Sequence, residues 1–287
     1  MMESNTQSTI WITGAGGLIG NELVPLTRAR FPGARVIGLT RAMLDLADAR
    51  TVRDRFAAER PNLILHCAAI SRSPVCQAQP DLARQINVGV TRLLAELSDA
   101  ATLVLFSTDL VFDGRRGGYT ERDEPNPLMV YAETKVDAER IVLTNPRHLV
   151  VRTSLNYGHS LTGDRSFNEE ILQAWRAGRT LRLFTDEFRA PLAAVETARA
   201  VLDLVAASAT GLFHVAGRER LSRFQIGELL AARHPEVHPK LEPASTKEFA
   251  GAPRPPDVTL NCAKAEAILR RPLPAFSEWL QANAAVA

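Results

Sequence analysis

The chain has 287 residues, of which 46% are hydrophobic and 23% charged, and its formal net charge is +2 at pH 7. This composition is typical of an ordinary soluble globular protein with one large domain, or with a main domain and a smaller lobe. The sequence has no run of basic residues that could follow a nucleic-acid backbone. It also has no stretch that reaches the roughly 18 apolar residues of a membrane span. We therefore expect neither nucleic acid nor a membrane as a partner.

The cysteines and the first residues bear on the cellular compartment. The three cysteines (Cys67, Cys76 and Cys262) are odd in number and form no Cys-x-x-Cys pair, which fits a reducing compartment. Residues 1–8 lack the basic start and apolar run of a signal peptide. We expect a cytoplasmic protein. Because the histidines and cysteines show no spacing typical of metal ligands, we predict no metal site.

In the first half of the chain, short apolar runs alternate with helical patterns. The apolar runs lie at 9–13, 34–39, 62–68, 102–108 and 148–153. Such runs are too short for buried helices and suit strands that are buried on both faces. The helical patterns lie between them, up to about residue 30, at 51–60, at 81–100 and from about residue 131. Strands that alternate with helices predict βαβ units and a parallel sheet.

The second half follows a looser pattern. Helical patterns occur at 166–177, 193–208, 222–233 and 263–270, and the proline-rich segment 235–256 is expected to be mostly loop. We predict an α/β fold with a doubly wound parallel-sheet Rossmann domain over residues 9–155. A smaller mixed C-terminal substrate lobe covers 156–287. This lobe is discontinuous, because later strands at about 193–217 are expected to return to the main sheet.

A glycine-rich stretch, TGAGGLIGNEL, follows the first predicted strand directly and opens a predicted helix. Gly14, Gly17 and Gly20 have the spacing of a dinucleotide loop, in which glycines permit a tight turn, close approach to a pyrophosphate and close helix packing. The helix N-terminus, with Leu18 and Ile19, would offer free N–H groups to the phosphates. A glycine-rich turn without a ligand is the alternative.

The end of the second strand bears on which dinucleotide binds. An NAD site usually has an acidic residue there for the ribose 2′-hydroxyl, but this strand ends at Leu39 and continues with Thr40 and Arg41. A guanidinium pairs well with a 2′-phosphate. We predict NADP(H) and leave NAD(H) open. The alternative is that Arg41 is a plain solvated surface residue.

One tyrosine and one lysine stand four residues apart in a chain that has three tyrosines and four lysines. Tyr131 and Lys135 would share a helix face. An ammonium group close to a phenol would lower the pKa of the phenol toward working pH. Thr108, at the end of the fourth predicted strand, could position the tyrosine proton, since ligands of open α/β sheets bind at such strand ends. Taken alone, the pair is compatible with chance.

The motifs taken together resemble a known family. In order, TGAGGLIG, HCAA, STDLVFDG, YAETK and RTSLNYG resemble the extended branch of the short-chain dehydrogenases/reductases. Within that branch, the stretch from STDLVFDG to VDAER and the late motif RPPDVTLNCAK (254–264) resemble the dTDP-4-dehydrorhamnose reductase group. The resemblance spans about residues 9–270. The group includes a non-catalytic relative, the regulatory beta subunit of methionine adenosyltransferase.

The resemblance implies roles for individual residues. Thr108, Tyr131 and Lys135 match the catalytic triad, in which the tyrosine protonates a keto oxygen while the nicotinamide delivers hydride. The residues implied at the cofactor, besides the glycine loop, Thr40, Arg41 and the Tyr–Lys pair, are Asp45, Leu46, Ala68, Ala69 and Asn87. Those expected at the substrate are Asp109, Leu155, Asn156, Arg189 and Arg254, with Lys264 in the segment that closes on the sugar nucleotide.

The chain departs from the family where the substrate is expected. Leu155 stands where the rhamnose reductases usually have tryptophan, and Leu192 follows Pro191 in place of threonine. The stretch after the third strand, which is usually acidic in those enzymes, reads SRSPVCQAQ in this chain. We expect an NADPH-dependent reductase of a 4-keto nucleotide sugar, with a homodimer left open. The alternatives are an NAD-dependent sugar-nucleotide epimerase or dehydratase and a non-catalytic NADP-binding regulatory subunit.

Some other polar residues invite a functional interpretation that we do not adopt. His66 and His214 lie in apolar, strand-like runs and are expected to be core or strand-end histidines with satisfied hydrogen bonds. Glu169 and Glu170 could suggest paired carboxylates, but adjacent helix positions diverge, so we expect a solvated face. Trp279 is expected to pack on the core or on a second subunit.

Overall fold

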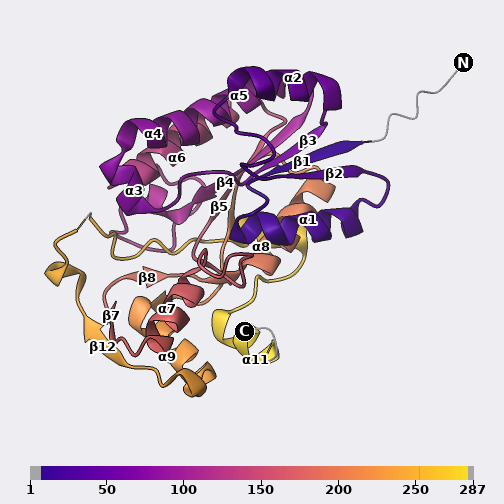
Figure 1. Ribbon diagram of the computed structural model, residues 1–287. Coiled ribbons are helices and arrows are strands. Elements are labelled where there is room, and N and C mark those ends of the chain that lie inside the picture. Colours follow the sequence, from indigo (N-terminus) through magenta and orange to yellow (C-terminus); the bar gives the residue numbers. More distant parts are fainter. Residues whose placement is uncertain (1–7, 252, 284–287) are drawn as a thin grey trace, which may run out of the picture.

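The computed structural model describes residues 8–251 and 253–283 (Figure 1). The expectation that the chain begins without a signal peptide concerns residues 1–8, of which 1–7 lie outside the described part. Across the residues described, none of the helices combines the length and the apolar character needed to cross a bilayer.

A six-stranded sheet forms the centre of the molecule, and all its strand pairs are parallel. Its strands, in spatial order, are β10 (Gly211–Val215), β5 (Leu149–Thr153), β4 (Thr102–Thr108), β3 (Leu63–His66), β1 (Thr9–Thr13) and β2 (Arg35–Leu39). The order reverses at β1, whose two neighbours are β3 and β2. At such a switch point the loops after neighbouring strands turn to opposite sides and leave a crevice for a ligand.

Helices cover both faces of this sheet, which explains why its strands are mostly apolar. On one face Ile10 and Ile12 pack toward α1 (Leu18–Arg30), α8 (Ala194–Ala206) and α10 (Ala263–Leu269). On the other face Trp11 packs toward α2 (Ala49–Glu59), α5 (Val90–Leu97) and α6 (Val130–Val142). The predicted doubly wound α/β fold is confirmed.

The segment 81–100, expected to be one helix, is divided. It consists of α4 (Pro80–Arg84), a π-helical turn (Gln85–Gly89) and α5, and a short helix α3 (Ser73–Ala78) precedes it. The wider turn carries the buried Asn87. Turns of this kind occur frequently at functional sites, and apolar periodicity alone does not reveal them.

A third group of buried side chains lies apart from the sheet, in what we call the smaller lobe. Its helices are α7 (Phe167–Arg176), α9 (Arg223–Arg233) and α11 (Phe276–Ala282). Its short strands are β6 (Asn156–Tyr157) paired with β9 (Leu192–Ala193), β7 (Leu181–Phe184) with β12 (Leu241–Ala244), and β8 (Phe188–Arg189) with β11 (Leu221–Ser222). Three short 3₁₀ turns complete the fold, at Asp109–Val111, Pro235–Val237 and Thr246–Glu248. The boundaries 9–155 and 156–287 remain a prediction.

Local signals in the sequence explain where the helices of the smaller lobe begin. Ser166 and Ser222 cap α7 and α9. In each case the serine hydroxyl accepts a bond from the backbone N–H of the residue three positions later, and the side chain of that residue accepts a bond from the serine N–H. In α7 that residue is Glu169, which the fold turns back onto the helix start, leaving it only 7% exposed. The expected solvated face is therefore wrong for Glu169. Trp279 packs in this lobe, edge-on to Tyr157.

Candidate active site

The glycine loop leaves the N-terminus of α1 open toward the carboxyl edge of the sheet. Its N-cap residue, Gly17, offers no side chain to the first N–H groups of the helix, and the first turn contains no acidic residue. Gly14 has a φ of 69°, and a Cβ there would lie 2.7 Å from the backbone nitrogen of Ala68. A Cβ on Gly20 would lie 2.2 Å from the carbonyl oxygen of Gly14. These contacts require glycine, and the open helix end suits an anionic group.

The residues after β2 lie at the surface. The Arg41 side chain is 89% exposed, and its Nη2 is 3.9 Å from Oδ2 of Asp45. An exposed pair at that distance is weak, so the guanidinium can turn toward an anion. Leu46 packs partly against the core beneath it. Beside this segment, between α1 and the end of β2, is a pocket of about 360 Å³ whose lining includes Ala15 and Gly38.

Asn87 fastens the segment after β3 to helix α6. Its side chain accepts a hydrogen bond from the Ile70 nitrogen at 2.8 Å and donates to the Ile70 oxygen at 3.0 Å. Its Nδ2 also lies 3.0 Å from the Thr134 hydroxyl, which donates in turn to the Tyr131 carbonyl at 2.6 Å. The Ala68 nitrogen, near the start of this segment, donates to the Thr13 hydroxyl of β1 at 3.4 Å. The strand end expected beneath a cofactor is therefore held to the helix that carries Tyr131.

The fold brings Thr108, Tyr131 and Lys135 together. Thr108 ends β4, and Tyr131 and Lys135 project from the first turns of α6, which packs on β4. The Thr108 hydroxyl is hydrogen-bonded to the Tyr131 side chain. It also accepts a bond from the Leu110 nitrogen at 3.2 Å, which helps to orient it.

The ionisation of Tyr131 differs from what its spacing to Lys135 suggests. We expected the lysine to lower the pKa of the phenol. The structure shows the opposite direction: burial raises the pKa of Tyr131, and the carboxylate of Asp109 raises it further. Thr108 opposes this through its hydrogen bond. The phenol of Tyr131 is therefore protonated, as a proton donor must be.

Lys135 lies deeper than Tyr131 and faces the end of β3. Its side chain is 2% exposed, and its charge acts on His66 and Cys67. Burial lowers the pKa of Lys135 to about 8, with Glu139 opposing the shift. This position explains why the lysine does not lower the pKa of the tyrosine in this structure.

Two of the residues predicted at the substrate bind each other. Asp109 and Arg189 form a buried ion pair, with Nε of Arg189 2.8 Å from Oδ2 and Nη2 2.5 Å from Oδ1. The Ser154 hydroxyl also donates to Asp109, at 2.6 Å. The pair links the segment after β4 to β8 of the smaller lobe. Its side chains border Tyr131, since the charges of both act on the phenol.

The other predicted substrate residues have different surroundings. Leu155 packs partly against the core of the smaller lobe. The Asn156 amide is saturated: it donates to Thr153 Oγ1 at 2.9 Å and accepts from Thr197 at 2.6 Å. Arg254 pairs with Glu187 at 2.5 Å.

Arg254 also lies over the rings of Phe184 and Phe249, at 5.1 Å and 5.3 Å from their centroids. Lys264 donates to the Leu212 carbonyl of β10, at 2.7 Å, and lies over the Phe213 ring. Substrate binding by these residues remains a prediction.

Two arginines near the site escaped the sequence analysis. Arg72, in the segment after β3, reaches the smaller lobe, where its Nη2 is 3.1 Å from the Asp164 carbonyl and 3.8 Å from a Glu170 oxygen. Arg223, the first residue of α9, is largely desolvated, which lowers its pKa to about 10. Ser222 caps the helix, but no sequence signal shows that the arginine after it is partly buried and desolvated.

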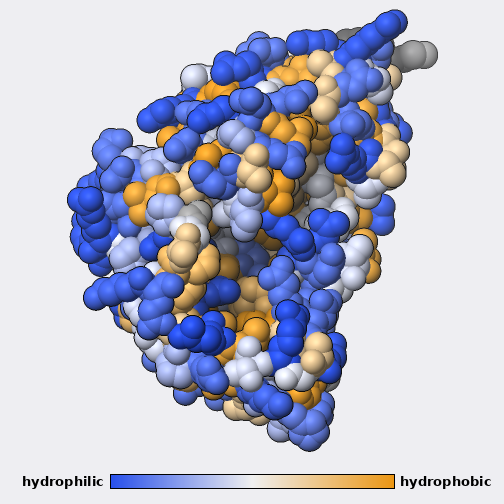
Figure 2. Space-filling model, turned by 60° about the vertical axis from the view of Figure 1, so that its left-hand side comes forward, coloured by the Kyte–Doolittle hydropathy of each residue, from blue (hydrophilic) through white to orange (hydrophobic). Residues whose placement is uncertain are grey.

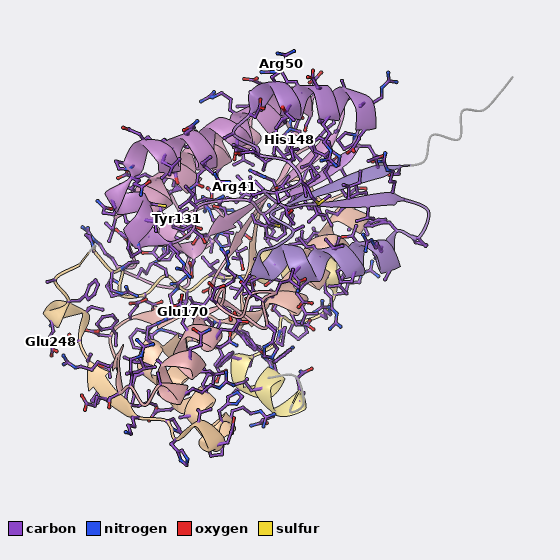
Figure 3. All side chains as sticks on the ribbon, viewed as in Figure 1. Arg41, Arg50, Tyr131, His148, Glu170 and Glu248 are labelled. Carbon is purple, nitrogen blue, oxygen red and sulfur yellow. The ribbon has the colours of Figure 1, made fainter. Side chains whose placement is uncertain are left out.

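The surface is hollowed between the sheet-bearing part of the molecule and the smaller lobe, with both apolar and polar residues on its wall (Figure 2). Figure 3 shows Tyr131 in the first of these parts and Glu170 in the second. The histidines expected in the core are there: His66 bonds to Thr13 at 2.7 Å, and His214 to the Tyr119 carbonyl at 3.0 Å.

Comparison with known proteins identifies the family. The family described as "RmlD substrate binding domain" matches residues 8–286. Methionine adenosyltransferase 2 subunit beta of Rattus norvegicus is 30% identical over 273 residues, which are 90% of this chain and 82% of that protein. The probable low-salt glycan biosynthesis reductase Agl14 of Haloferax volcanii is 31% identical over 236 residues, covering 76% of this chain and 77% of that protein.

The fold comparison agrees with the sequence comparison. The crystal structure of dTDP-4-dehydrorhamnose reductase from Bacillus anthracis in complex with NADP superposes with a TM-score of 0.88. It is 25% identical in sequence, and the match covers 96% of this chain and 98% of that one. The chain therefore belongs to the RmlD substrate-binding-domain family, the dTDP-4-dehydrorhamnose reductase-like group of extended short-chain dehydrogenases/reductases.

Proposed function

We propose that the protein is an NADPH-dependent reductase of a 4-keto nucleotide sugar. The observation that carries this proposal is the convergence of Thr108, Tyr131 and Lys135 at the carboxyl edge of the sheet. The side chains that the family's chemistry requires are all present. They lie next to a glycine loop that is shaped for a dinucleotide.

The residues of the chain fit the dinucleotide that the family uses. The open N-terminus of α1, with Gly17, Leu18 and Ile19, would hold its pyrophosphate. Ala68 and Ala69 would lie beneath it, while Lys135 would bind the hydroxyls of the nicotinamide ribose. When bound, the reduced nicotinamide supplies the hydride.

Tyr131 supplies the proton in this mechanism. Its phenol is protonated in the free protein because burial and Asp109 disfavour the phenolate. The phenol O–H donates to the keto oxygen of the sugar. As the keto carbon gains hydride, the π pair of the C=O bond moves to the oxygen, which takes the proton as the phenol O–H bond breaks. Thr108 then stabilises the phenolate that is left by a hydrogen bond, and the Arg189 guanidinium stabilises it by charge.

NADP(H) is the proposed cofactor, with Arg41 at the 2′-phosphate. The exposure of Arg41 and its weak pairing with Asp45 support this choice, as does the relative crystallised with NADP. Arg41→Ala should weaken NADPH binding about 10-fold or more while leaving NADH binding nearly unchanged. Titration of protein fluorescence with each cofactor measures this. A clear preference of the wild type for NADH would contradict the assignment.

A regulatory subunit is the second candidate, since the match with methionine adenosyltransferase 2 subunit beta covers 90% of this chain. That candidate predicts NADPH binding without turnover. Against it stands the complete Thr–Tyr–Lys set.

Incubation with NADPH and a panel of 4-keto nucleotide sugars, followed by loss of NADPH absorbance, separates the two candidates. Oxidation with at least one sugar supports the reductase. Binding of NADPH without oxidation by any sugar favours the regulatory role, and an epimerase would convert its sugar with no net consumption of cofactor.

A further inference from the structure

A buried ion pair lies directly behind Lys135. Glu139 follows Lys135 by four residues on α6, so both side chains leave the same face of the helix. Glu139 is 3% exposed. Arg152 of β5 binds both oxygens of its carboxylate, with Nη2 2.7 Å from Oε2 and Nε 3.0 Å from Oε1. The Ser107 hydroxyl of β4 donates to Oε1 as well.

Two residues of the described part act electrostatically on Lys135, Glu139 and Cys67, and Glu139 is the one that carries a charge. Burial lowers the pKa of Lys135, and the carboxylate opposes this. The neighbours at the end of β3 are neutral near pH 7, because burial raises the pKa of the Cys67 thiol and lowers that of His66 to about 3. The charge of Lys135 therefore depends on Glu139.

A carboxylate four residues after a buried lysine would ordinarily pair with it. Here Arg152 and Ser107 occupy the carboxylate instead, and the ion pairs of the described residues include none with Lys135. Arg152 is itself held in place, since it lies over the Phe112 ring and its Nη1 is 3.5 Å from His214. The lysine thus keeps a nearby negative charge without being bound by it.

We propose that Glu139 and Arg152 form a positioning pair for Lys135, in which the carboxylate keeps the ammonium charged and the guanidinium keeps the carboxylate from capturing it. This rests on the role that the proposed function gives to Lys135. Both residues are buried, with 3% and 2% of their surface exposed, and both act through the lysine.

Two single substitutions should move Lys135 in opposite directions. Glu139→Gln removes the negative charge and leaves Arg152 uncompensated, so the pKa of Lys135 should fall by about one unit or more. Arg152→Met frees the carboxylate to pair with Lys135, so its pKa should rise by a similar amount. A purely structural role would destabilise the protein in both variants without shifts of opposite sign.

The lysine content makes a direct measurement feasible. The chain has four lysines, so the ¹³Cε signals of lysine-labelled protein can be resolved by NMR, and loss of one signal in Lys135→Met assigns it. The expected wild-type midpoint is about 8. Glu59→Gln is the matched control, since Glu59 is a largely buried carboxylate on α2 that pairs with Arg55. It should leave the Lys135 midpoint unchanged.

If the single variants do not fold, the double variant Glu139→Met/Arg152→Met replaces the pair with apolar groups, a change that buried pairs often tolerate. Its Lys135 midpoint should still fall, because the carboxylate acts on the lysine more strongly than the guanidinium does. Shifts of the same sign in the two single variants, or an unchanged midpoint in the double variant, would overturn the proposal. Because the titration needs no substrate, failure to find a keto sugar would count against the proposed function alone.

Discussion

At the scale of single residues, burial decides how the reactive groups ionise. Tyr131 and Lys135 are both driven toward their neutral forms, the first with a raised pKa and the second with a pKa lowered to about 8. Spacing along a helix predicted that they share a face, but not the depth of each group. A protonated phenol beside a charged lysine is the state in which proton donation can begin.

Replacing Tyr131 by Phe removes only the phenolic oxygen. We expect turnover to fall by about 10²–10⁴-fold, since the proton donor is lost. NADPH affinity should change by less than about threefold, because the glycine loop and Lys135 are unaffected. Stopped assays with a keto sugar that the wild type reduces measure the first quantity, and fluorescence titration measures the second. Turnover at the wild-type rate would rule out Tyr131 as the proton donor.

Two buried histidines should make stability depend on pH. Burial lowers the pKa of His66 and His214 to about 3 in the folded state, against about 6.5 when unfolded. Their contribution is complete above about pH 6.5. It is lost progressively as the pH falls from there toward 3, because the unfolded chain binds the protons.

His66→Gln removes one of these titrations. Between about pH 6 and 4, the free energy of unfolding of the wild type should fall more steeply than that of the variant, by up to about 1.4 kcal/mol per pH unit. Urea denaturation at a series of pH values gives both slopes. Parallel slopes would mean that His66 does not remain neutral in the fold.

At the scale of elements, the loop between β1 and α1 combines a steric requirement with an electrostatic one. A side chain at Gly14 would meet the backbone of the segment after β3, at Ala68. The glycine spacing in the sequence predicts this loop, and its position at the switch point of the sheet follows from the strand order.

Gly14→Ala should therefore abolish detectable NADPH binding and destabilise the fold. The positive φ alone costs about 1–2 kcal/mol, and the displaced Ala68 backbone adds to it. Gly33→Ala is the matched control, since nothing lies within 4 Å of a Cβ at that position. Thermal unfolding and NADPH titration of both variants test this, and equal behaviour of the two would contradict the steric account.

At the scale of the whole molecule, the sheet-bearing part and the smaller lobe are joined by charged contacts. Asp109, after β4, and Arg189, in β8, are 80 positions apart in the sequence and meet in a buried pair. Arg72 reaches across to Asp164 and Glu170 at the surface. The buried pair dominates, because removal of one partner leaves a desolvated charge.

Asp109→Asn should lower the free energy of unfolding by about 3–5 kcal/mol, since it leaves the Arg189 guanidinium buried without a counter-charge. Arg182→Ala breaks an exposed ion pair with Glu248 and should change stability by less than about 1 kcal/mol. Urea denaturation of both variants makes the comparison. A loss below 1 kcal/mol in Asp109→Asn would show that the pair does not hold the two parts together.

Much of the fold and part of the site could be predicted because their signals are local. Apolar runs predicted the strands β1 and β4 to the residue, and the helical patterns at 166–177 and 222–233 predicted α7 and α9 to within about one residue at each end. The π-turn around Asn87 could not be predicted, because the side chain of Asn87 bonds to Ile70, after β3, and to Thr134, in α6, which are remote from it in the sequence.

The sequence by itself determined the parallel α/β architecture and predicted the glycine loop and the candidate set of Thr108, Tyr131 and Lys135, since strand runs, glycine spacing and the Tyr–Lys spacing are local patterns in the chain. Only the tertiary structure decided the depth of Lys135, the raised pKa of Tyr131 and the pairing of Arg189 with Asp109. Desolvation and charge pairing depend on what the folded chain brings close in space. Strand and helix periodicity depend on neighbouring residues in the sequence, whereas the pKa values of buried groups depend on how remote segments pack around them.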